Sequence, residues 1–237
     1  MQSGDRELRQ NIRTYKQNGE AALPSTGVVA DELLARELAH PGSDSRHGVN
    51  LVCCPPPKLI ERIAAIQRRL SEFEPAQYYY PSQDLHLTLV EICHSRCESD
   101  AAATAIAVRS VAPAFLAQEQ PATIDSPVLV SDARGAAINF LPCDDRLQKL
   151  RAGIKDHLAL HGVVGDSRYP QQSAHVTILR YIQPLRTPVA TWLDVMNRCQ
   201  IVLNDAWELD EVWLTWGATW YGMLGRIQRV NLKKGPA

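Results

Sequence analysis

The sequence predicts an α+β fold of two pseudo-symmetric halves, in which antiparallel sheet covered by helices surrounds a central cleft. Small groups of strand-like segments alternate with helical segments, the order expected when helices pack against mostly antiparallel sheets. The halves also look alike, because in each a long helix precedes a strand that carries the sequence His-x-Thr. With 237 residues, 45% of them hydrophobic, the chain is long enough to bury a sizeable core.

The first 48 residues differ from the rest and are predicted to form a partly helical N-terminal extension. They are polar apart from an amphipathic stretch over 28–38, which we expect to be one helix. Helix-breaking residues follow at 40–45 and predict a loop. Residues 49–237 are expected to form the main domain.

The main domain begins with a strand, a helix and two further strands. An apolar run over 49–54 predicts a buried strand. Three prolines at 55–57 end it, and proline is tolerated in the first turn of the helix that follows. The apolar residues of that helix fall at steps of four and three: Leu59, Ile63, Ile66, Leu70 and Phe73. Residues 78–80 and 85–92 are then expected to be strands.

Helices and strands continue to alternate in the second part of the chain. We expect a helix over 98–111 and then a hairpin with strands at 127–131 and 136–141. The next helix starts near Asp144, an N-cap candidate, and ends at Gly162. The remaining expected elements are a strand at 174–181, a helix at 189–198 and a strand at 207–216.

Composition and charge exclude several classes of protein. The 25 Lys and Arg residues against 26 Asp and Glu give a formal net charge of −1, without the basic excess of a protein that coats nucleic acid. No stretch approaches the roughly 18 uncharged apolar residues that span a bilayer, and the charged N-terminus lacks a signal-peptide pattern. We therefore expect a cytoplasmic protein without membrane contact. Six cysteines in a chain of this length predict free thiols rather than a disulfide framework.

Two short motifs carry the candidate chemistry, and they read His86-Leu87-Thr88-Leu89 and His175-Val176-Thr177-Ile178. Since residues i and i+2 of a strand share a face, each histidine lies beside its own threonine. An imidazole with a pKa of about 6.5 is an acid or a base at neutral pH, and two of them fill both roles in one reaction. Threonine hydroxyls donate hydrogen bonds to phosphate oxygens. Facing each other across a cleft, these four side chains suit metal-free transfer at phosphorus.

The paired motifs resemble those of the two-histidine (2H) phosphoesterase superfamily, whose signature is two His-x-Ser/Thr-x sequences, one in each of two duplicated lobes. The resemblance covers residues 48–217 and implies a bilobal fold that acts on a 2′,3′-cyclic phosphate or a similar phosphodiester, with a small nucleotide or an RNA terminus as substrate. It implies His86 and His175 as catalytic residues, and Thr88 and Thr177 as phosphate-binding residues. By similarity His175 activates water and His86 is the acid, with exchanged roles as the alternative.

Four further residues are weaker candidates for substrate contacts. Arg180 lies three residues after the second threonine, so strand alternation places it on the opposite face unless the strand bulges. A surface salt bridge is therefore favoured over a phosphate clamp. Tyr181 keeps the parity of the motif and is expected to reach the cleft edge, while Tyr78 and Tyr80 share a face of a neighbouring strand. All three tyrosines suit stacking on a base, and core or rim packing explains them equally well.

Two other functions stay open. A binding module would hold a nucleotide or an RNA end in the same cleft without turnover, and intact motifs do not prove turnover. A metal-dependent hydrolase that uses His86 and His175 is disfavoured, because Asp84 precedes the first histidine by two residues whereas Ser173 occupies that place before the second. We therefore predict no metal site and no cofactor. The sequence identifies no protein partner.

Overall fold

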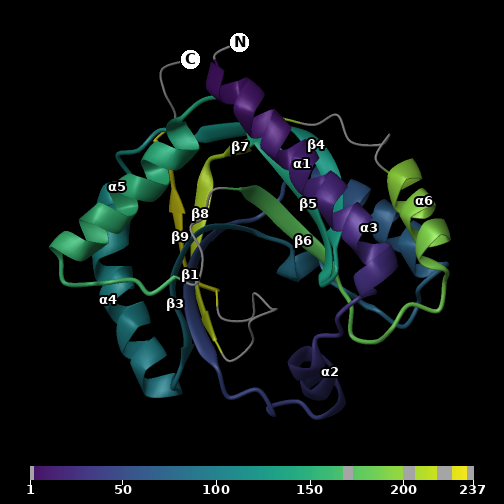
Figure 1. The fold of residues 1–237 in the computed structure, drawn as a ribbon. Coiled ribbons are helices and arrows are strands. Elements are labelled where there is room, and N and C mark those ends of the chain that lie inside the picture. The colour runs from purple at the N-terminus through teal and green to yellow at the C-terminus, as the bar shows by residue number, and fades with distance from the viewer. Residues whose placement is uncertain (1–2, 168–172, 200–205, 218–225, 234–237) are drawn as a thin grey trace.

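The computed structural model describes residues 3–167, 173–199, 206–217 and 226–233 (Figure 1). The helices are α1 (Ser3–Thr26), α2 (Glu32–Ala39), α3 (Pro57–Ser71), α4 (Glu98–Leu116), α5 (Arg146–Leu160) and α6 (Val189–Cys199), with a 3₁₀ turn at Ser82–Asp84. The strands are β1 (His47–Cys53), β2 (Tyr78–Tyr79), β3 (Leu87–Arg96), β4 (Ala122–Asp132), β5 (Gly135–Pro142), β6 (Ala174–Arg180), β7 (Trp207–Leu209), β8 (Glu211–Gly217) and β9 (Arg226–Asn231).

The described strands form one curled antiparallel sheet. Its order is β7-β4-β5-β6-β3-β1-β8-β9, with β2 paired to β6. Asp210 alone separates β7 from β8 in the chain, yet β7 pairs with β4 while β8 pairs with β1 near the other end of the sheet. The sheet must curl for these ends to approach, as Figure 1 shows. The single strand expected at 207–216 is therefore two strands, because the chain passes between the two halves there.

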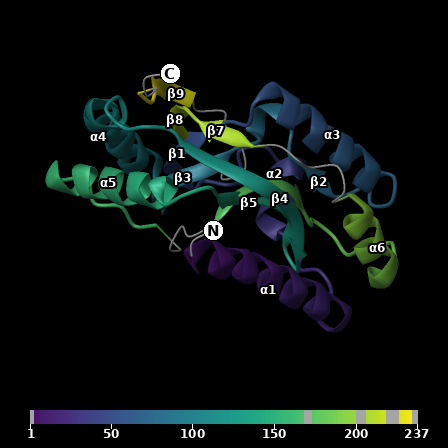
Figure 2. The ribbon, with the colours of Figure 1, turned by 90° about the horizontal axis from the view of Figure 1, so that it is seen from above.

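The two motif strands, β3 and β6, lie where the two halves of the sheet meet. In one half α4 packs against β1, β3 and β8, and in the other α3 packs on β6 and α6 on β4. Helix α5 bridges the halves, because it contacts both β3 and β4 as well as α4. Figure 2 shows α1 and α3 on opposite sides of the sheet. The predicted α+β class with a cleft is confirmed.

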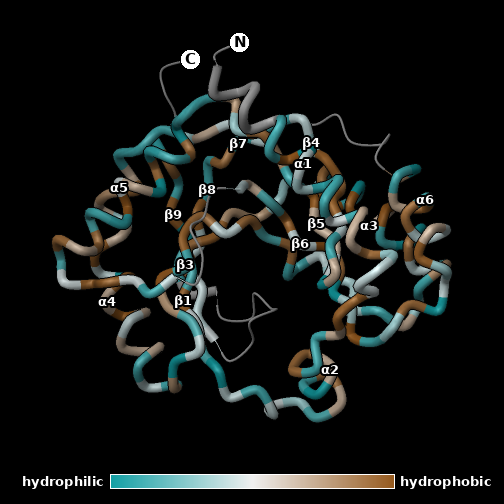
Figure 3. The backbone as a smooth tube through the Cα atoms, viewed as in Figure 1, coloured by the Kyte–Doolittle hydropathy of each residue, from teal (hydrophilic) through white to brown (hydrophobic). Residues whose placement is uncertain are grey.

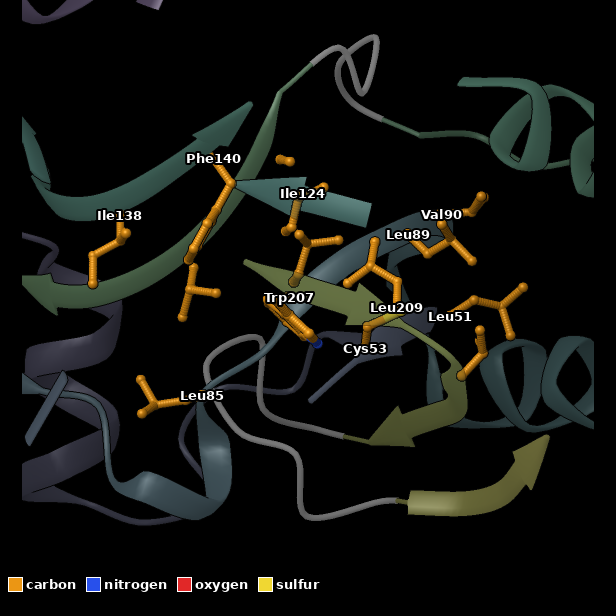
Figure 4. Close-up of a cluster of buried hydrophobic side chains, with 14 of the residues drawn as sticks. Leu51, Cys53, Leu85, Leu89, Val90, Ile124, Ile138, Phe140, Trp207 and Leu209 are labelled. Carbon is orange, nitrogen blue, oxygen red and sulfur yellow. The ribbon is translucent and has the colours of Figure 1, made fainter. Parts of the chain in front are cut away.

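The core lies inside the curled sheet and beneath its covering helices. Figure 4 shows Phe140 of β5, Ile124 of β4 and Trp207 of β7 pointing toward one another. The Phe140 and Trp207 rings meet edge to face with centroids 5.9 Å apart, and both side chains are buried. Each such large apolar side chain stabilises the fold by roughly 1.5–3 kcal/mol through burial. Along the helices, Figure 3 shows hydrophobic residues alternating with hydrophilic ones, as the amphipathic patterns predict.

The N-terminal segment contains two helices rather than the one expected. Helix α2 lies within the predicted stretch, and the Asp31 carboxylate caps it by accepting a hydrogen bond from the Leu34 N–H at 3.0 Å. Helix α1 was not predicted, and it lies against β4 (Figure 2). Its Ile12 packs in a small apolar cluster of β4 and β5 residues, and its Leu23 is fully buried. The domain boundary at residue 48 stays a prediction.

The structure bears on several expectations from composition. All six cysteines are free thiols, as predicted. Among the described residues, no helix combines the length and apolar character needed to cross a membrane. In the same residues, no three or more His, Cys, Asp or Glu side chains gather as a metal-binding group.

Candidate active site

The register between β3 and β6 brings the two motifs together. The described residues form one ladder pair between these strands, Leu87 opposite Val176. Continuing that antiparallel register by one residue in each direction places His86 opposite Thr177 and Thr88 opposite His175. Residues directly opposite in an antiparallel pair share a face of the sheet. Both histidines and both threonines therefore lie on one face at the junction of the halves.

A carbonyl group fixes the orientation of the His86 ring. His86 precedes β3, immediately after the 3₁₀ turn, and its side chain is half-buried. Its Nδ1 atom lies 2.7 Å from the backbone oxygen of Asp84, which assigns the Nδ1–H as the donor. A proton exchanged with a substrate is then carried on Nε2. In functional histidines generally, a hydrogen bond at one ring nitrogen fixes the tautomer and the orientation of the ring in this way.

His175 is neutral at physiological pH in this environment. Its side chain is exposed and lines a cavity, and the Ser173 Oγ lies 2.9 Å from its Nδ1. Desolvation by the surrounding protein, followed by the positive charges of His86, Arg151 and Arg180, lowers the pKa of His175 to about 4. Desolvation is incomplete for a ring that water reaches, but the positive charges act in the same direction. A neutral imidazole is the form that accepts a proton.

A bulge in β6 reverses the expected placement of Arg180. Thr177 pairs with Ala137 and Leu179 pairs with Ala136, so Ile178 is an extra residue on β6. Ile178 and Leu179 are consequently both buried. The extra residue restores Arg180 to the face of Thr177, and both line the same cavity. The placement on the opposite face, expected from strand alternation, is thereby corrected, because the strand bulges.

The same bulge turns Tyr181 into the core, which corrects the expectation that it reaches the cleft edge. Tyr181 is fully buried, and its hydroxyl lies 2.9 Å from the Ser131 Oγ and accepts a hydrogen bond from the Trp192 Nε1–H at 2.8 Å. Tyr80 is also buried, and its phenol hydrogen-bonds Arg180, so it supports that side chain from behind. Tyr78 is half-buried and packs edge to face on the Tyr80 ring at 5.2 Å. These three tyrosines are absent from the cavity lining.

Arg151 of α5 ties the two motif strands together, a role that the sequence did not reveal. Its side chain is 4% exposed, and its guanidinium donates to the backbone oxygens of Thr88 and Leu89 at 3.0 Å and of Ser173 at 2.9 Å. Burial lowers the pKa of Arg151 to about 10, which leaves it charged at neutral pH. It thus satisfies buried carbonyl groups where β3 and β6 part.

A cavity of about 530 Å³ opens on the motif face of β6. His175, Thr177, Arg180 and Ser173 line one side of it. Asn139, which pairs with His175 across the sheet, and the small residues 135–137 of β5 form its floor. The opposite wall comes from α1. His86 and Thr88 do not line this cavity; the β3–β6 register places them beside it.

Comparison with solved structures identifies the fold. ATU0111 of Agrobacterium tumefaciens str. C58, a conserved protein of unknown function, matches with a TM-score of 0.59 and 11% identity over 86% of this chain and 97% of its own. TT0787 of Thermus thermophilus matches with a TM-score of 0.54 and 13% identity over 78% of this chain and 97% of its own. E. coli LigT in complex with 3′-AMP matches with a TM-score of 0.45 and 18% identity, covering 79% and 96%. The chain has the fold of the two-histidine phosphoesterases.

This confirms, at the level of the fold, the resemblance inferred from the two motifs. No protein-family model matches the chain, and no curated protein matches it. Because the identities are low, the two-histidine fold alone is shared, and the roles of individual residues depend on the geometry of this site. Roughly a fifth of the chain lies outside the match to TT0787, which covers 78% of it.

Proposed function

We propose that this protein is a phosphodiesterase that hydrolyses 2′,3′-cyclic phosphates or related nucleotide or RNA phosphodiesters without needing a metal. The observation that carries the proposal is the register of β3 and β6, which sets His86, Thr88, His175 and Thr177 on one face of the sheet. Arg180 adds a positive charge on that face. A phosphate group there would meet two hydroxyl donors and one cation.

The chemistry of the two rings assigns their roles. The Nε2 atom of neutral His175 removes a proton from water as the water oxygen attacks phosphorus. The Nδ1–H of the same ring is directed to the Ser173 Oγ. The bond from phosphorus to the ribose 2′ or 3′ oxygen breaks, and that oxygen takes a proton from Nε2 of His86. The product is a phosphate monoester with a free ribose hydroxyl. His175 ends protonated and His86 neutral, and proton exchange with solvent restores both. Thr88, Thr177 and Arg180 stabilise the negative charge that builds up on the phosphoryl oxygens.

Turnover after EDTA treatment tests this proposal, with 2′,3′-cyclic nucleotides and cyclic-phosphate-ended RNA as substrates. The His86→Ala and His175→Ala variants should each lose roughly 100- to 10,000-fold in kcat, because each removes a general acid or base. His161→Ala is the matched control, since His161 is exposed at the end of α5 and lies outside the site.

Three results would contradict the proposal. Activity that EDTA abolishes would refute the metal-free mechanism. Unchanged activity in either histidine variant would refute its assigned role. Nucleotide binding without turnover on any of these substrates would favour a binding module instead.

A further inference from the structure

The wall of the cavity opposite His175 belongs to the N-terminal helix. Asn11, Ile12 and Tyr15 of α1 line the same cavity as His175 and Arg180. Figure 1 shows α1 crossing in front of β4 and β5, and Figure 2 shows it along one side of the sheet. A segment that the two-histidine motifs do not include therefore shapes the candidate substrate site.

Helix α1 is held in this position by specific contacts. Gly19 approaches β4 so closely that a Cβ atom there would lie 2.5 Å from the Ser131 backbone oxygen. Lys16 donates from Nζ to the Asn197 Oδ1 at 2.7 Å and thereby ties α1 to α6. Ile12 is 8% exposed in its apolar cluster. The helix is thus docked by close packing as well as by polar bonds, and the cavity wall it forms is built into the fold.

Tyr15 has the properties of an aromatic platform. Its side chain is 52% exposed although it lines a cavity, so its ring surface is accessible to a ligand. Its hydroxyl donates to the Asp132 Oδ2 at 2.7 Å, and Asp132 itself accepts from the backbone N–H groups of Arg134 and Gly135. The ring is therefore fixed before any ligand arrives. A fixed aromatic ring loses little conformational freedom when it stacks on a ligand.

The rest of the cavity suits a nucleoside. Its volume of about 530 Å³ falls within the range of roughly 300–1,000 Å³ that is usual for small-molecule sites. The carboxamides of Asn11 and Asn139 offer donors and acceptors of the kind that base edges pair with. The phosphate-binding candidates Thr177 and Arg180 lie in the same cavity.

We propose that α1 completes the substrate site, with Tyr15 as the platform on which the base of a nucleoside cyclic phosphate stacks. This proposal rests on the proposed function and adds to it the substrate class, a phosphodiester that carries a base. Tyr15 takes the stacking role for which the sequence offered Tyr78, Tyr80 and Tyr181 as candidates, none of which lines the cavity.

Binding measured by titration calorimetry tests the role of Tyr15 in the full-length chain, with all proteins carrying His86→Ala so that the probes are not hydrolysed during the titration. The probes are 2′,3′-cyclic AMP and glycerol 1,2-cyclic phosphate, which has the five-membered cyclic phosphate but no base. Tyr15→Ala should weaken binding of 2′,3′-cyclic AMP by roughly 5- to 140-fold, the loss expected for one base–aromatic stack, and leave binding of the glycerol compound unchanged. Tyr15→Phe keeps the ring without its bond to Asp132 and should remain within about 5-fold of the His86→Ala parent. Gln17→Ala, an exposed change on α1 outside the cavity lining, is the matched control.

The two variants separate stacking from loss of docking, since both lose the bond to Asp132 but only Tyr15→Ala loses the ring. Equal weakening of both probes by Tyr15→Ala, unchanged binding of 2′,3′-cyclic AMP, or binding of neither probe by the His86→Ala parent would overturn the proposal. Binding of 2′,3′-cyclic AMP that depends on the Tyr15 ring, in a protein without turnover, would support the role of Tyr15 and contradict the phosphodiesterase activity. Turnover that is unchanged by Tyr15→Ala would support the phosphodiesterase activity and overturn the role of Tyr15.

Discussion

Replacing Arg151 by methionine should destabilise the whole domain and weaken catalysis. The side chain is only 4% exposed, and its guanidinium donates three hydrogen bonds to the backbone oxygens of Thr88, Leu89 and Ser173. Methionine fills a similar volume but donates nothing, so those carbonyl groups lose their charged partner. A hydrogen bond to a charged group contributes about 1.5–3 kcal/mol, and the removal of a buried charge also relieves its desolvation cost. Each carbonyl group left without its partner costs about 1–3 kcal/mol, and the relieved desolvation offsets part of the sum, so we expect a net loss of several kcal/mol in the free energy of unfolding.

Urea unfolding at pH 7, followed by circular dichroism, measures this loss as a fall in the midpoint at constant m-value. Lys149→Met on the same helix is the matched control, because its ion pair with Asp145 is exposed and should change the stability by under about 1 kcal/mol. Arg151→Lys keeps the charge but loses the forked guanidinium donors, so its loss of stability should lie between those of Arg151→Met and Lys149→Met. A loss below about 1 kcal/mol in Arg151→Met would refute the view that this side chain holds the motif strands together.

Four further predictions concern the site and the helix beside it. Since the pKa of His175 is lowered to about 4, the acid limb of kcat/KM should lie well below pH 6.5; a limb at 6.5 or above would contradict the role of His175 as base. The lowered pKa also means that the unfolded chain binds the extra proton between pH 4 and 6.5, so unfolding titrations should show this group favouring stability as the pH rises through that window. Arg180→Ala should raise KM by roughly 10- to 150-fold and Arg180→Lys by less, whereas equal effects would exclude a forked phosphate contact. Gly19→Ala should loosen α1, because overpacking against Ser131 costs about 1–3 kcal/mol, whereas the higher helix propensity of alanine regains only about 1 kcal/mol. Hydrogen exchange of the α1 amides measures this loosening as faster exchange. Slower exchange than in wild type would contradict the prediction.

The sequence predicted the parts of the site that obey simple periodicity. Alternation in a strand placed His175 beside Thr177, and the repeated motif predicted a matching pair elsewhere. The structure brings the two pairs together through one ladder contact, Leu87 opposite Val176. The helix stripe from Leu59 to Leu70 and the free cysteines were also predicted correctly, whereas Phe73 lies beyond the end of α3 at Ser71. Each of these depends on local pattern or composition, which a single sequence contains.

Features that depend on tertiary contacts were not predictable in the same way. The role of Arg151 was not predictable, because its burial against backbone carbonyls depends on α5 crossing the junction of the halves. Helix α1 has apolar or small residues at Ile12, Tyr15, Gly19 and Leu23, steps of three and four that outline a narrow stripe. That stripe was the available signal, but the polar composition of the segment obscured it. The contact of Tyr15 with Asp132 joins residues 117 positions apart.

One buried amide supports the bulge in β6 from the helix side of the sheet. The extra residue, Ile178, has no ladder partner on β5. Gln67 of α3 is buried, and its Nε2 donates to the Ile178 oxygen at 2.9 Å and to the Tyr80 oxygen at 2.8 Å. The Tyr80 N–H also donates to the Ile178 oxygen, at 3.1 Å. A polar residue at the margin of the α3 stripe therefore stabilises an irregular strand, and this irregularity directs Arg180 to the cavity and Tyr181 to the core. A residue outside the cavity lining thus supports the strand that carries the candidate phosphate-binding arginine.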